Sequence, residues 1–383
     1  MNKRIVHIVL NQFTHDSRVI RQCKSLVKKG YKVNIVAIWA NGLPYYETEY
    51  GYDVIRIPIF TKSWSKNPII QIIKYLEFVV RSLYKIKKIK PAICHGHDPS
   101  GLLVAFGVKY IFNSKLIYDS HELWSNSIHL QGNKKILFKI GRKIEKYLIK
   151  RTDEVITVNK SIAEILSLEN NIKSITIIRN MPEINNDKSK FKKDEFDFPE
   201  CNFNLIYVGN IENGRGIDII INAMELVDDN IGLVLMGKDS EYKTSMEVLS
   251  NTKNYNNRIK FLKAVEPDQV VNICRLANVG ISPTQNLCKS YYLSLPNKIF
   301  QYIEAGIPVL ASDFPEMKNI IENYNVGMTF SVTSSQSIAN SINTVYNDHA
   351  SYQRFCYNSK IASNTLNWET EQNNLYGLYK KLD

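Results

Sequence analysis

Valine- and isoleucine-rich runs alternate with amphipathic segments from the start of the chain. Within residues 4–39, RIVHIVL, RVIRQCKSLVKKG and YKVNIVAIW are predicted to form a strand, a helix and a strand. Asp16 or Ser17 would cap the helix, and Gly30 would end it. Two strands joined through a helix predict a parallel sheet.

The same alternation continues to residue 182 and restarts at residue 201. In the first part, further strands are predicted at 54–60, 92–97, 115–121, 154–159 and 174–180, and helices near 68–89, 99–112, 133–151 and 160–169. In the second part, strands are predicted at 204–210, 232–237, 258–264, 279–283 and 308–313, and helices at 216–226, 241–251, 267–275, 298–306, 334–348 and 351–363.

This rhythm predicts two α/β domains, each a Rossmann-like, doubly wound sheet. Residues 1–182 would form the first domain, the polar segment 183–200 a linker, and residues 201–365 the second domain. Residues 366–383 have too few apolar side chains for a core helix of the second sheet, so we expect them to cross back to the first domain. Doubly wound sheets bind ligands beyond the carboxyl ends of their strands, which predicts a cleft between two facing domains.

Composition and charge limit the classes of binding partner but do not identify one of them. The net charge is +12, and residues 1–150 hold 26 Lys and Arg against 9 Asp and Glu. A basic half of this kind can meet nucleic acid, anionic lipid or a phosphorylated substrate. The six cysteines form no Cys-x-x-Cys pair, no apolar run reaches 18 residues, and the N-terminal segment lacks a signal-peptide pattern. We therefore expect reduced thiols and a cytoplasmic protein.

The strongest local signal is the segment 294–309, SLPNKIFQYIEAGIPV, which is predicted to be a loop, a helix ended by Gly306 and a buried strand. Asn297 would cap the helix, and the N–H groups of its first turn would bind a diphosphate together with Lys298. Gln301 lies one turn later and could reach a ribose hydroxyl. An ordinary capped helix fits the same spacing equally well.

Polar residues also follow the predicted strands of the first domain. The loop 11–16 follows the first strand, and His121 and Glu122 follow another. We expect these residues to line the cleft, with His121 nearest the reacting group and Asp119 orienting the loop. A structural histidine is an equally good interpretation of His121.

His95, His97 and Asp98 crowd a third strand end and suggest a metal site. Because one residue separates the two histidines on an extended chain, we expect their imidazoles to point to opposite faces, and hence we expect no metal. A Walker loop, a Gly-x-Ser-x-Gly elbow and a Cys/His nucleophile pair are absent, and NQFTHDS stands where a dinucleotide fingerprint would follow the first strand. These absences argue against NAD and ATP chemistry.

Six segments resemble family 4 retaining glycosyltransferases, which have the two-domain GT-B fold, and they occur in the order of that family. The resemblance covers nearly the whole chain. The segments are Asp16-Ser17-Arg18-Val19 with Gly30 and Val33, His95-Gly96-His97-Asp98, Tyr118-Asp119-Ser120-His121-Glu122, Arg179-Asn180-x-Pro182, Tyr207-Val208-Gly209 with Arg215-Gly216, and Pro296-Asn297-Lys298 through Pro308-Val309.

The resemblance implies a UDP-sugar or GDP-sugar donor bound by the second domain, a glycan or lipid-linked acceptor bound by the first, and transfer with retention. It implies that Arg215 and Lys298 neutralise the leaving diphosphate, and that the leaving phosphate accepts the proton of the acceptor without a metal or other cofactor. Because of its position after a strand, beside Asp119 and Glu122, we also expect His121 to take part in catalysis. The implied donor contacts are Gly209, Asn210, Arg215, Gly237, Pro296, Asn297, Lys298 and Gln301. The implied acceptor or cleft-loop residues are Asn11, Thr14, Asp16, Arg18, His97, Asp119, Glu122 and Asn180.

Three positions depart from the pattern of the family. Leu293 and Gln301 replace a pair of glutamates, and Asn210 stands where many members carry a second basic residue. Gln301 can still bind ribose, whereas Leu293 cannot bind a sugar hydroxyl, and Glu304 is interpreted as a solvated helix residue. A catalytically silent partner of another transferase is therefore an alternative. A sugar-nucleotide 2-epimerase is another, although the carboxylates and histidine pattern of epimerases are not apparent.

Two basic amphipathic segments, 66–90 and 133–151, mix aromatic and aliphatic residues with dense Lys and Arg. Helices of this kind lie on anionic membranes, which would place the protein at the inner face of the cell membrane with a lipid-linked acceptor of surface polysaccharide or glycoconjugate biosynthesis. Two ordinary core helices with solvated lysines fit equally well. Nucleic acid fits less well, because no known nucleic-acid module is present.

Overall fold

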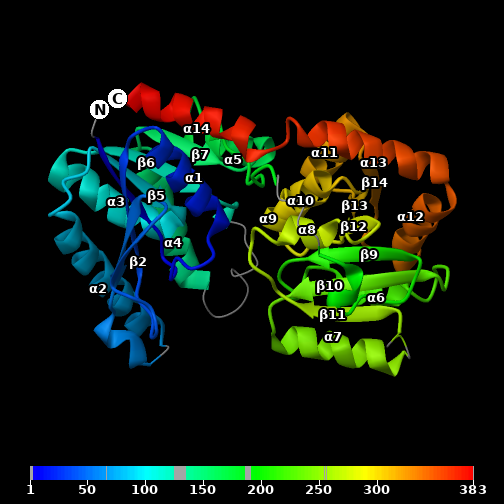
Figure 1. The fold of residues 1–383 in the computed structure, drawn as a ribbon. Helices are drawn as coiled ribbons and strands as arrows, with labels where there is room; N and C mark the ends of the chain where they lie inside the picture. Colours follow the sequence, from blue (N-terminus) through cyan, green and yellow to red (C-terminus); the bar gives the residue numbers. More distant parts are fainter. Residues whose placement is uncertain are drawn as a thin grey trace. The chain divides into compact units, whose positions relative to one another are not determined.

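The structure, a computed structural model, describes residues 3–65, 67–124, 135–185, 191–253, 255 and 257–382, with side chains from residue 141 onward in the helix that begins at 135. Its contacts divide the chain into two compact units (Figure 1). Unit 1 comprises Met1–Arg179 and Gln372–Asp383, and unit 2 comprises Asn180–Glu371. Each unit contains one mainly parallel sheet with helices, so the predicted fold class of two doubly wound α/β domains is confirmed.

Unit 1 contains an eight-stranded sheet in the order β3-β4-β2-β1-β5-β6-β7-β8, which is parallel except for the pairing of β3 with β4. Its strands are β1 (Arg4–Ile8), β2 (Lys32–Ile38), β3 (Tyr46–Glu49), β4 (Tyr52–Ile57), β5 (Ile93–His97), β6 (Lys115–Ser120), β7 (Glu154–Thr157) and β8 (Thr176–Ile177). Its helices are α1 (Ser17–Lys28), the 3-10 helix η1 (Phe60–Ser63), α2 (Pro68–Ile86), α3 (Asp98–Phe112), α4 (Lys135–Ile149) and α5 (Lys160–Asn170).

Helix α1 shows how local sequence sets the first crossover. The Asp16 side chain accepts a hydrogen bond from the Val19 N–H and caps the helix, as predicted. The helix ends at Lys28, and Gly30 follows with a φ of 86°. Its buried residues include Val19, Cys23, Ser25 and Leu26, and they also include two long polar side chains, Arg18 and Gln22. Those polar residues face the sheet and become important for the site below.

Unit 2 contains a six-stranded sheet in the order β11-β10-β9-β12-β13-β14, in which every pairing is parallel. Its strands are β9 (Phe203–Val208), β10 (Ile231–Gly237), β11 (Ile259–Lys263), β12 (Val279–Ser282), β13 (Val309–Ser312) and β14 (Gly327–Phe330). Its helices are the 3-10 helix η4 (Lys193–Glu195), α6 (Ile217–Ala223), α7 (Glu241–Thr252), α8 (Val270–Cys274), α9 (Lys289–Tyr292), α10 (Asn297–Ala305), α11 (Pro315–Tyr324), α12 (Ser335–Asn347) and α13 (His349–Ser363).

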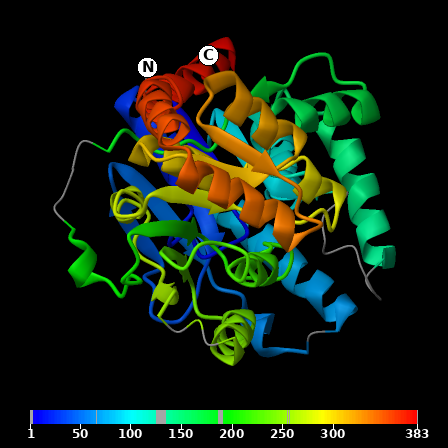
Figure 2. The ribbon, with the colours of Figure 1, turned by 90° about the vertical axis from the view of Figure 1, so that its right-hand side faces the viewer.

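Two hydrophobic cores lie on the two faces of the unit 2 sheet, and helices flank the strands in both views (Figures 1 and 2). Ile206 and Val208 of β9 face the core formed with α8, α10 and α11. Leu205 and Tyr207 of the same strand face the core formed with α6 and α12. Because both faces are covered, β9 is apolar along its whole length apart from Asn204.

The last helix, α14 (Trp368–Leu382), begins in unit 2 and ends in unit 1 (Figure 1). Ser25 of α1 donates a hydrogen bond to the Gln372 side chain at 2.9 Å. Leu375, Leu378 and Tyr379 are buried in unit 1. The C-terminal segment therefore contributes three core side chains to the unit that contains the N-terminus.

Helix α2 buries few of its side chains: only Phe78, Ser82 and Ile86. Its exposed apolar side chains are Ile69, Ile72, Ile73, Leu76, Val80 and Tyr84. Within the ranges that the structure describes, however, no helix combines the length and the apolar character needed to cross a membrane.

Candidate functional site

A cluster of histidines and aspartates lies on one face of the unit 1 sheet, and strand register explains it. His7 of β1 is the register partner of His95 of β5, and His97 is the register partner of Asp119 on β6. Side chains two residues apart on a strand share a face. His7, His95, His97 and Asp119 therefore stand on the same face, and all four are buried.

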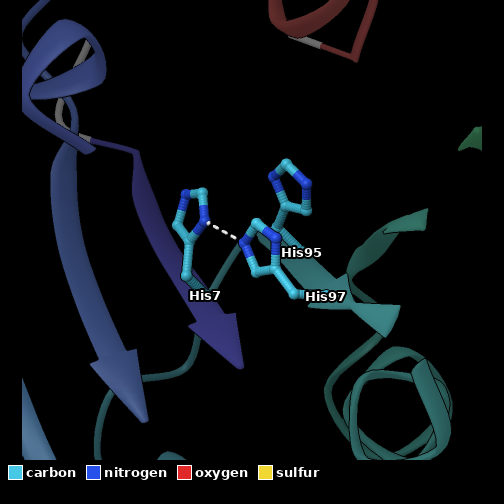
Figure 3. A group of neighbouring side chains, drawn as sticks. All are labelled: His7, His95 and His97. Carbon is cyan, nitrogen blue, oxygen red and sulfur yellow. Dashed lines mark hydrogen bonds between the residues drawn. The ribbon is translucent and has the colours of Figure 1, made fainter. Parts of the chain in front are cut away.

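The expectation that His95 and His97 point to opposite faces is thus wrong. The two imidazole rings are stacked, with centroids 4.4 Å apart and planes 13° apart (Figure 3). The physical reason is the period of two along a strand, which sends neighbouring residues to opposite faces and alternate residues to the same one. Gly96, between them, is the residue that faces the other side.

Two side chains of helix α1 form hydrogen bonds with the Asp119 carboxylate. Arg18 donates from Nη2 to Asp119 Oδ1 at 2.7 Å and from Nε to Oδ2 at 3.1 Å, and Gln22 donates to Oδ2 at 2.8 Å. Burial alone would raise the pKa of the Asp119 carboxyl, but Arg18 and then His121 outweigh it and hold that pKa well below its ordinary value. Asp119 is therefore a permanent anion inside unit 1.

The histidines form a hydrogen-bonded series that passes through Tyr379 of the C-terminal helix and ends at His95. His121 Nε2 lies 3.1 Å from His97 Nδ1, and His97 Nε2 lies 2.9 Å from His7 Nδ1, the bond drawn in Figure 3. His7 Nε2 lies 3.4 Å from the Tyr379 hydroxyl, which lies 2.9 Å from His95 Nδ1. The pKa values of His7, His95 and His97 are all lowered, and burial is the largest cause in each case. The pKa of His95 falls to about 3.

His121 behaves differently from the other three because carboxylates flank it. Asp98 accepts a hydrogen bond from the His121 backbone N–H at 3.1 Å, and its Oδ2 lies 3.4 Å from His121 Nδ1. Burial lowers the pKa of His121, but Asp98 and Asp119 outweigh burial and raise it to about 9. Asp98 holds this position with a φ of 54°, a left-handed conformation that is uncommon outside glycine. Burial in turn raises the pKa of Asp98.

Two triads in this cluster bring ligand-type atoms close enough for a metal ion: His7, His95 and His97, and His97, Asp119 and His121. A metal lies in the plane of an imidazole that binds it. The stacked, nearly parallel rings of His95 and His97 cannot both meet that condition for one ion. In the second triad, Asp119 Oδ2 already accepts hydrogen bonds from Arg18 and Gln22. The residues fit a hydrogen-bonded network better than a metal centre.

The other predicted residues of the first domain lie at the same carboxyl edge or next to it. Asn11 donates to Asp16 at 2.8 Å and accepts from the Phe13 N–H, which shapes the loop after β1, and Thr14 on that loop is exposed. Glu122 is half-buried and its carbonyl accepts a hydrogen bond from Ser120. Asn180, also half-buried, is the first residue of unit 2.

In unit 2 the central feature is a buried lysine. Lys298 lies on the first turn of α10 and is 9% exposed, with Nζ 3.5 Å from the centre of the Tyr207 ring. Among the residues that the structure describes, none forms a hydrogen bond or an ion pair with this ammonium group. Burial, and next the charge of Arg215, hold the pKa of Lys298 well below its ordinary value, and the Glu212 carboxylate opposes them only in part. The site therefore favours an added negative charge.

The expected cap of α10 is wrong in detail. Pro296, not Asn297, occupies the capping position, and no side chain caps the helix. Asn297 already belongs to the helix, so its side chain is past the position from which a cap reaches the N–H groups of the first turn. With no side-chain cap, those N–H groups remain suited to an anionic ligand. Gln301 lies one turn later and is half-buried.

Arg215 occupies a tight turn between two glycines with left-handed backbone. A Cβ at Gly216, where φ is 69°, would lie 1.9 Å from the Pro283 carbonyl oxygen, so only glycine fits. The Arg215 guanidinium lies 4.7 Å from the centre of the Tyr291 ring. It also donates to Glu212 Oε1, from Nη2 at 2.8 Å and from Nε at 3.0 Å, so one carboxylate already balances part of its charge.

The remaining predicted donor-binding residues lie at the carboxyl ends of β9 and β10. Gly209 leaves β9 beside Lys298, since a Cβ there would lie 3.5 Å from Lys298 Nζ. A Cβ at Gly237 would lie 2.3 Å from the Gly209 carbonyl oxygen, so these strand ends approach closely. The exposed Asn210 accepts a hydrogen bond from the Tyr207 hydroxyl through its carbonyl at 2.6 Å.

Two further positions on or near α10 are buried. Leu293 is 7% exposed, so it belongs to the interior. The interpretation of Glu304 as a solvated residue is wrong: its side chain is 6% exposed and accepts a hydrogen bond from the Asn185 N–H at 3.0 Å. It thereby ties the end of α10 to the segment that enters unit 2.

Sequence reasoning missed His7, Gln22 and Tyr379, each of which contacts a predicted residue. It named Tyr207 in a motif but did not predict its contact with Lys298. Gln22 carried a usable signal, since it lies four residues after Arg18 on the same face of α1. His7 and Tyr379 could be found only once the strand register and the path of α14 were known.

Comparison with known proteins identifies the fold and the family. Residues 17–182 match the family model "Glycosyltransferase Family 4", and residues 188–361 match "Glycosyl transferases group 1". Sucrose-phosphate synthase from Thermosynechococcus elongatus is similar with a TM-score of 0.83 and 17% identity, covering 100% of this chain and 99% of that one. Anabaena Alr3699/HepE in complex with UDP and glucose is similar with a TM-score of 0.75 and 15% identity, covering 99% and 100%.

A sequence relative, the chitobiosyldiphosphodolichol beta-mannosyltransferase of Candida albicans, is 24% identical over 388 residues, covering 91% of this chain and 82% of the relative. The two family models lie end to end and leave only short segments unmatched. Apart from Asp16, which precedes the first match by one residue, every predicted motif lies within one of the two matches. The chain therefore belongs to the family 4 glycosyltransferases of the GT-B fold.

Proposed function

We propose that this glycosyltransferase moves a hexose or an N-acetylhexosamine, with retention, from a UDP-sugar or GDP-sugar to a lipid-linked saccharide or glycan. The observation that carries the proposal is the largely buried side chain of Lys298, whose ammonium group forms no hydrogen bond or ion pair with the described residues and feels the Glu212 carboxylate only at longer range. A buried cation is costly unless it is paired, and the diphosphate of a sugar nucleotide would supply the missing charge. The first turn of α10 and Arg215 add further positive partners in unit 2.

Calorimetric titration of the protein with UDP and with GDP tests the donor site. The failure of both nucleotides and of their sugars to bind at millimolar concentration would contradict the proposal. In Lys298→Met, the nucleotide should bind about 10- to 100-fold more weakly, because a charge-assisted contact is lost. The unliganded variant should be as stable as the native protein or more stable, since a buried unpaired charge has been removed.

Lys318→Met is the matched control, because Lys318 is an exposed lysine of the same unit on α11 with its own partners, Asp313 and Glu322. It should leave the nucleotide affinity unchanged. Equal loss of affinity in both variants would indicate a diffuse electrostatic effect instead of a site at Lys298.

The chemical step is proposed from the family pattern. As the nucleoside diphosphate leaves, Lys298 and Arg215 would stabilise the charge that builds on it, and that phosphate would take the proton of the attacking hydroxyl. Retention is tested by nuclear magnetic resonance of the product, where the anomeric configuration should equal that of the donor. We propose that no metal or other resident cofactor takes part, so addition of EDTA should leave turnover unchanged.

The acceptor is proposed to be lipid-linked, with unit 1 resting on an anionic membrane at the cytoplasmic face. The support is the exposed apolar side of α2, which borders a surface groove of about 990 Å³ between that helix and β4. Arg81 and Lys85 line the same groove, so apolar and cationic groups lie together. The Candida albicans relative is, by its name, a transferase to a diphosphodolichol-linked saccharide.

Sedimentation with vesicles that contain anionic lipid tests this contact. The protein should bind at low salt, and binding should weaken at high salt because the ionic part is screened. Replacing Leu76 and Val80, both exposed on α2, by Ser should reduce binding further without a large loss of stability. Absence from the pellet at low salt would contradict the membrane proposal and leave the donor site untouched.

A second candidate function is a catalytically silent partner of another transferase. The buried Leu293 favours it, because a carboxylate expected by the family pattern is replaced by an apolar core residue. Nucleotide binding without release of free nucleotide in the presence of any acceptor would support the silent partner. Loss of turnover in the Lys298 variant would support the enzyme.

A further inference from the structure

Four hydrogen bonds connect His121 to His97, His7, Tyr379 and His95 in unit 1. The bond between His121 and His97 is partly buried, and the other three are buried. Each bond between two ring nitrogens has two possible directions, because a neutral imidazole carries its proton on either nitrogen. The directions are not independent, since a nitrogen that donates leaves the other nitrogen of the same neutral ring as an acceptor. Fixing one end of the series therefore fixes every tautomer in it.

The His121 end is fixed by its surroundings. Asp98 of α3 faces His121 Nδ1 at 3.4 Å, and Asp119 of β6 faces His121 Nε2 at 3.7 Å. The charge of Arg18 on α1 lowers the proton affinity of His121, but Asp119 already pairs with Arg18. His121 with both nitrogens protonated then gives a balanced set of two cations and two carboxylates.

The protonated His121 sets the direction of every other hydrogen bond in the series. His121 Nε2–H donates to His97 Nδ1, so His97 carries its proton on Nε2 and donates to His7 Nδ1. His7 then carries its proton on Nε2 and donates to the Tyr379 hydroxyl, which donates to His95 Nδ1. In this direction every acceptor atom of the series accepts one hydrogen bond, and every donor atom donates one.

The His95 end agrees with this direction independently. His95 must carry its proton on Nε2, the nitrogen that faces Asp119 Oδ2 at 3.7 Å. That nitrogen is buried and has no closer hydrogen-bond partner in the described residues. The opposite direction would place two lone pairs against the Asp119 carboxylate, one on His95 Nε2 and one on His121 Nε2, which is repulsive. The proposed direction places one lone pair there, on His97 Nδ1, which lies 3.6 Å from Asp119 Oδ2. The charge of Asp119 therefore favours the proposed direction.

We propose that His97, His7 and Tyr379 are positioning residues that form a one-way hydrogen-bond series and hold His121 as a fixed imidazolium at the carboxyl edge of the unit 1 sheet. Both ring nitrogens of His121 are then occupied, by Asp98 and by His97. His121 would act on a bound ligand as a fixed positive charge and not as a proton donor. This catalytic consequence rests on the proposed function, whereas the hydrogen-bond series itself does not.

Removing the Tyr379 hydroxyl should reverse the series. In Tyr379→Phe, a proton on His7 Nε2 would be buried without an acceptor, which is disfavoured. The proton then moves to His7 Nδ1, which donates to His97, and His97 donates to His121. His121 can accept that bond only after it loses its Nε2 proton to solvent. A hydroxyl on the C-terminal helix thereby controls the charge of His121.

Long-range proton–nitrogen correlation spectra of the full chain, labelled with ¹⁵N in histidine, test this directly. At pH 7 the native protein should show His7, His95 and His97 as Nε2–H tautomers and His121 as an imidazolium that titrates near pH 9. In Tyr379→Phe, His7 and His97 should become Nδ1–H tautomers, and His121 should titrate at least one pH unit lower.

Tyr376→Phe is the matched control, because it removes a hydroxyl from the same helix that bonds to Gln372 and touches no histidine of the series. It should leave all tautomers unchanged. An Nδ1–H tautomer of His7 or His97 in the native protein would overturn the proposal even if the Tyr379 variant failed to fold. Unchanged tautomers in a folded Tyr379→Phe variant would also overturn it. Both results come from the spectra and do not depend on whether the protein transfers sugar. A failure of the proposed function would appear only as absent turnover, so the two failures can be told apart.

Discussion

At the scale of single residues, the buried histidines make stability depend on pH. Burial lowers the pKa of His95 to about 3, whereas an unfolded histidine titrates near 6.5. Between these values the unfolded chain binds more protons, so stability is complete above about pH 6.5 and is lost as the pH falls. Between pH 6.5 and pH 5 we expect the titration of His95 alone to lower the free energy of unfolding by about 2 kcal/mol, which urea unfolding would measure.

His121 has the opposite sign, because its pKa in the folded protein is raised to about 9. Its contribution is complete below about pH 6.5 and is lost as the pH rises towards 9. Stability should therefore be highest near pH 6.5. In His95→Gln the acid side of the curve should become less steep, whereas His349→Gln, at an exposed position on α13, should leave it unchanged. An acid slope unaffected by His95→Gln would contradict the assignment.

At the scale of elements, the turn before α6 carries Arg215 and depends on Gly216. In Gly216→Ala, strain from the left-handed backbone adds to a contact of 1.9 Å with the Pro283 carbonyl oxygen. We expect a loss of about 1–3 kcal/mol or more in the free energy of unfolding and weaker UDP or GDP binding, because the turn must shift. Gly30→Ala is the control, since its φ is 86° but no atom lies within 4 Å. It should cost about 1 kcal/mol and leave nucleotide binding unchanged.

Elements also show how far the sequence predicts this structure. Apolar runs such as RIVHIVL and FNLIYV identify strands because both faces of these sheets are covered. The edge strand β3, whose residues are mostly exposed, and helix α11, which follows directly on a strand, have no comparable pattern and were not predicted.

The candidate site was predicted in part for the same physical reason. Lys298, Arg215, Asp119 and His121 lie at ends of elements, where short motifs reveal them. The partner of His97 on β1 depends on strand register, and Tyr379 reaches His95 across 284 positions of sequence. Local patterns do not contain such long-range pairings, so the hydrogen-bonded network could only be read from the fold.

At the scale of the whole molecule, the C-terminal helix links the two ends of the chain within unit 1. Leu378 of α14 is 1% exposed and belongs to unit 1, whereas Lys298 and Arg215 belong to unit 2, which has its own cores. Leu378→Ala should therefore destabilise unit 1 by about 2–5 kcal/mol, because it leaves a cavity. The variant should bind UDP or GDP with native affinity, since the donor residues belong to the other unit.

Scanning calorimetry with and without the nucleotide that binds separates the two units. Ligand stabilises the state that binds it, so the nucleotide should raise the midpoint of the transition that belongs to unit 2. Leu378→Ala should lower the other midpoint, and Lys380→Ala, an exposed change on the same helix, should move neither. A single transition that responds to both the nucleotide and Leu378→Ala would mean that α14 couples the units into one cooperative body. In that case the return of the C-terminus to unit 1 would connect the stability of the histidine network to donor binding.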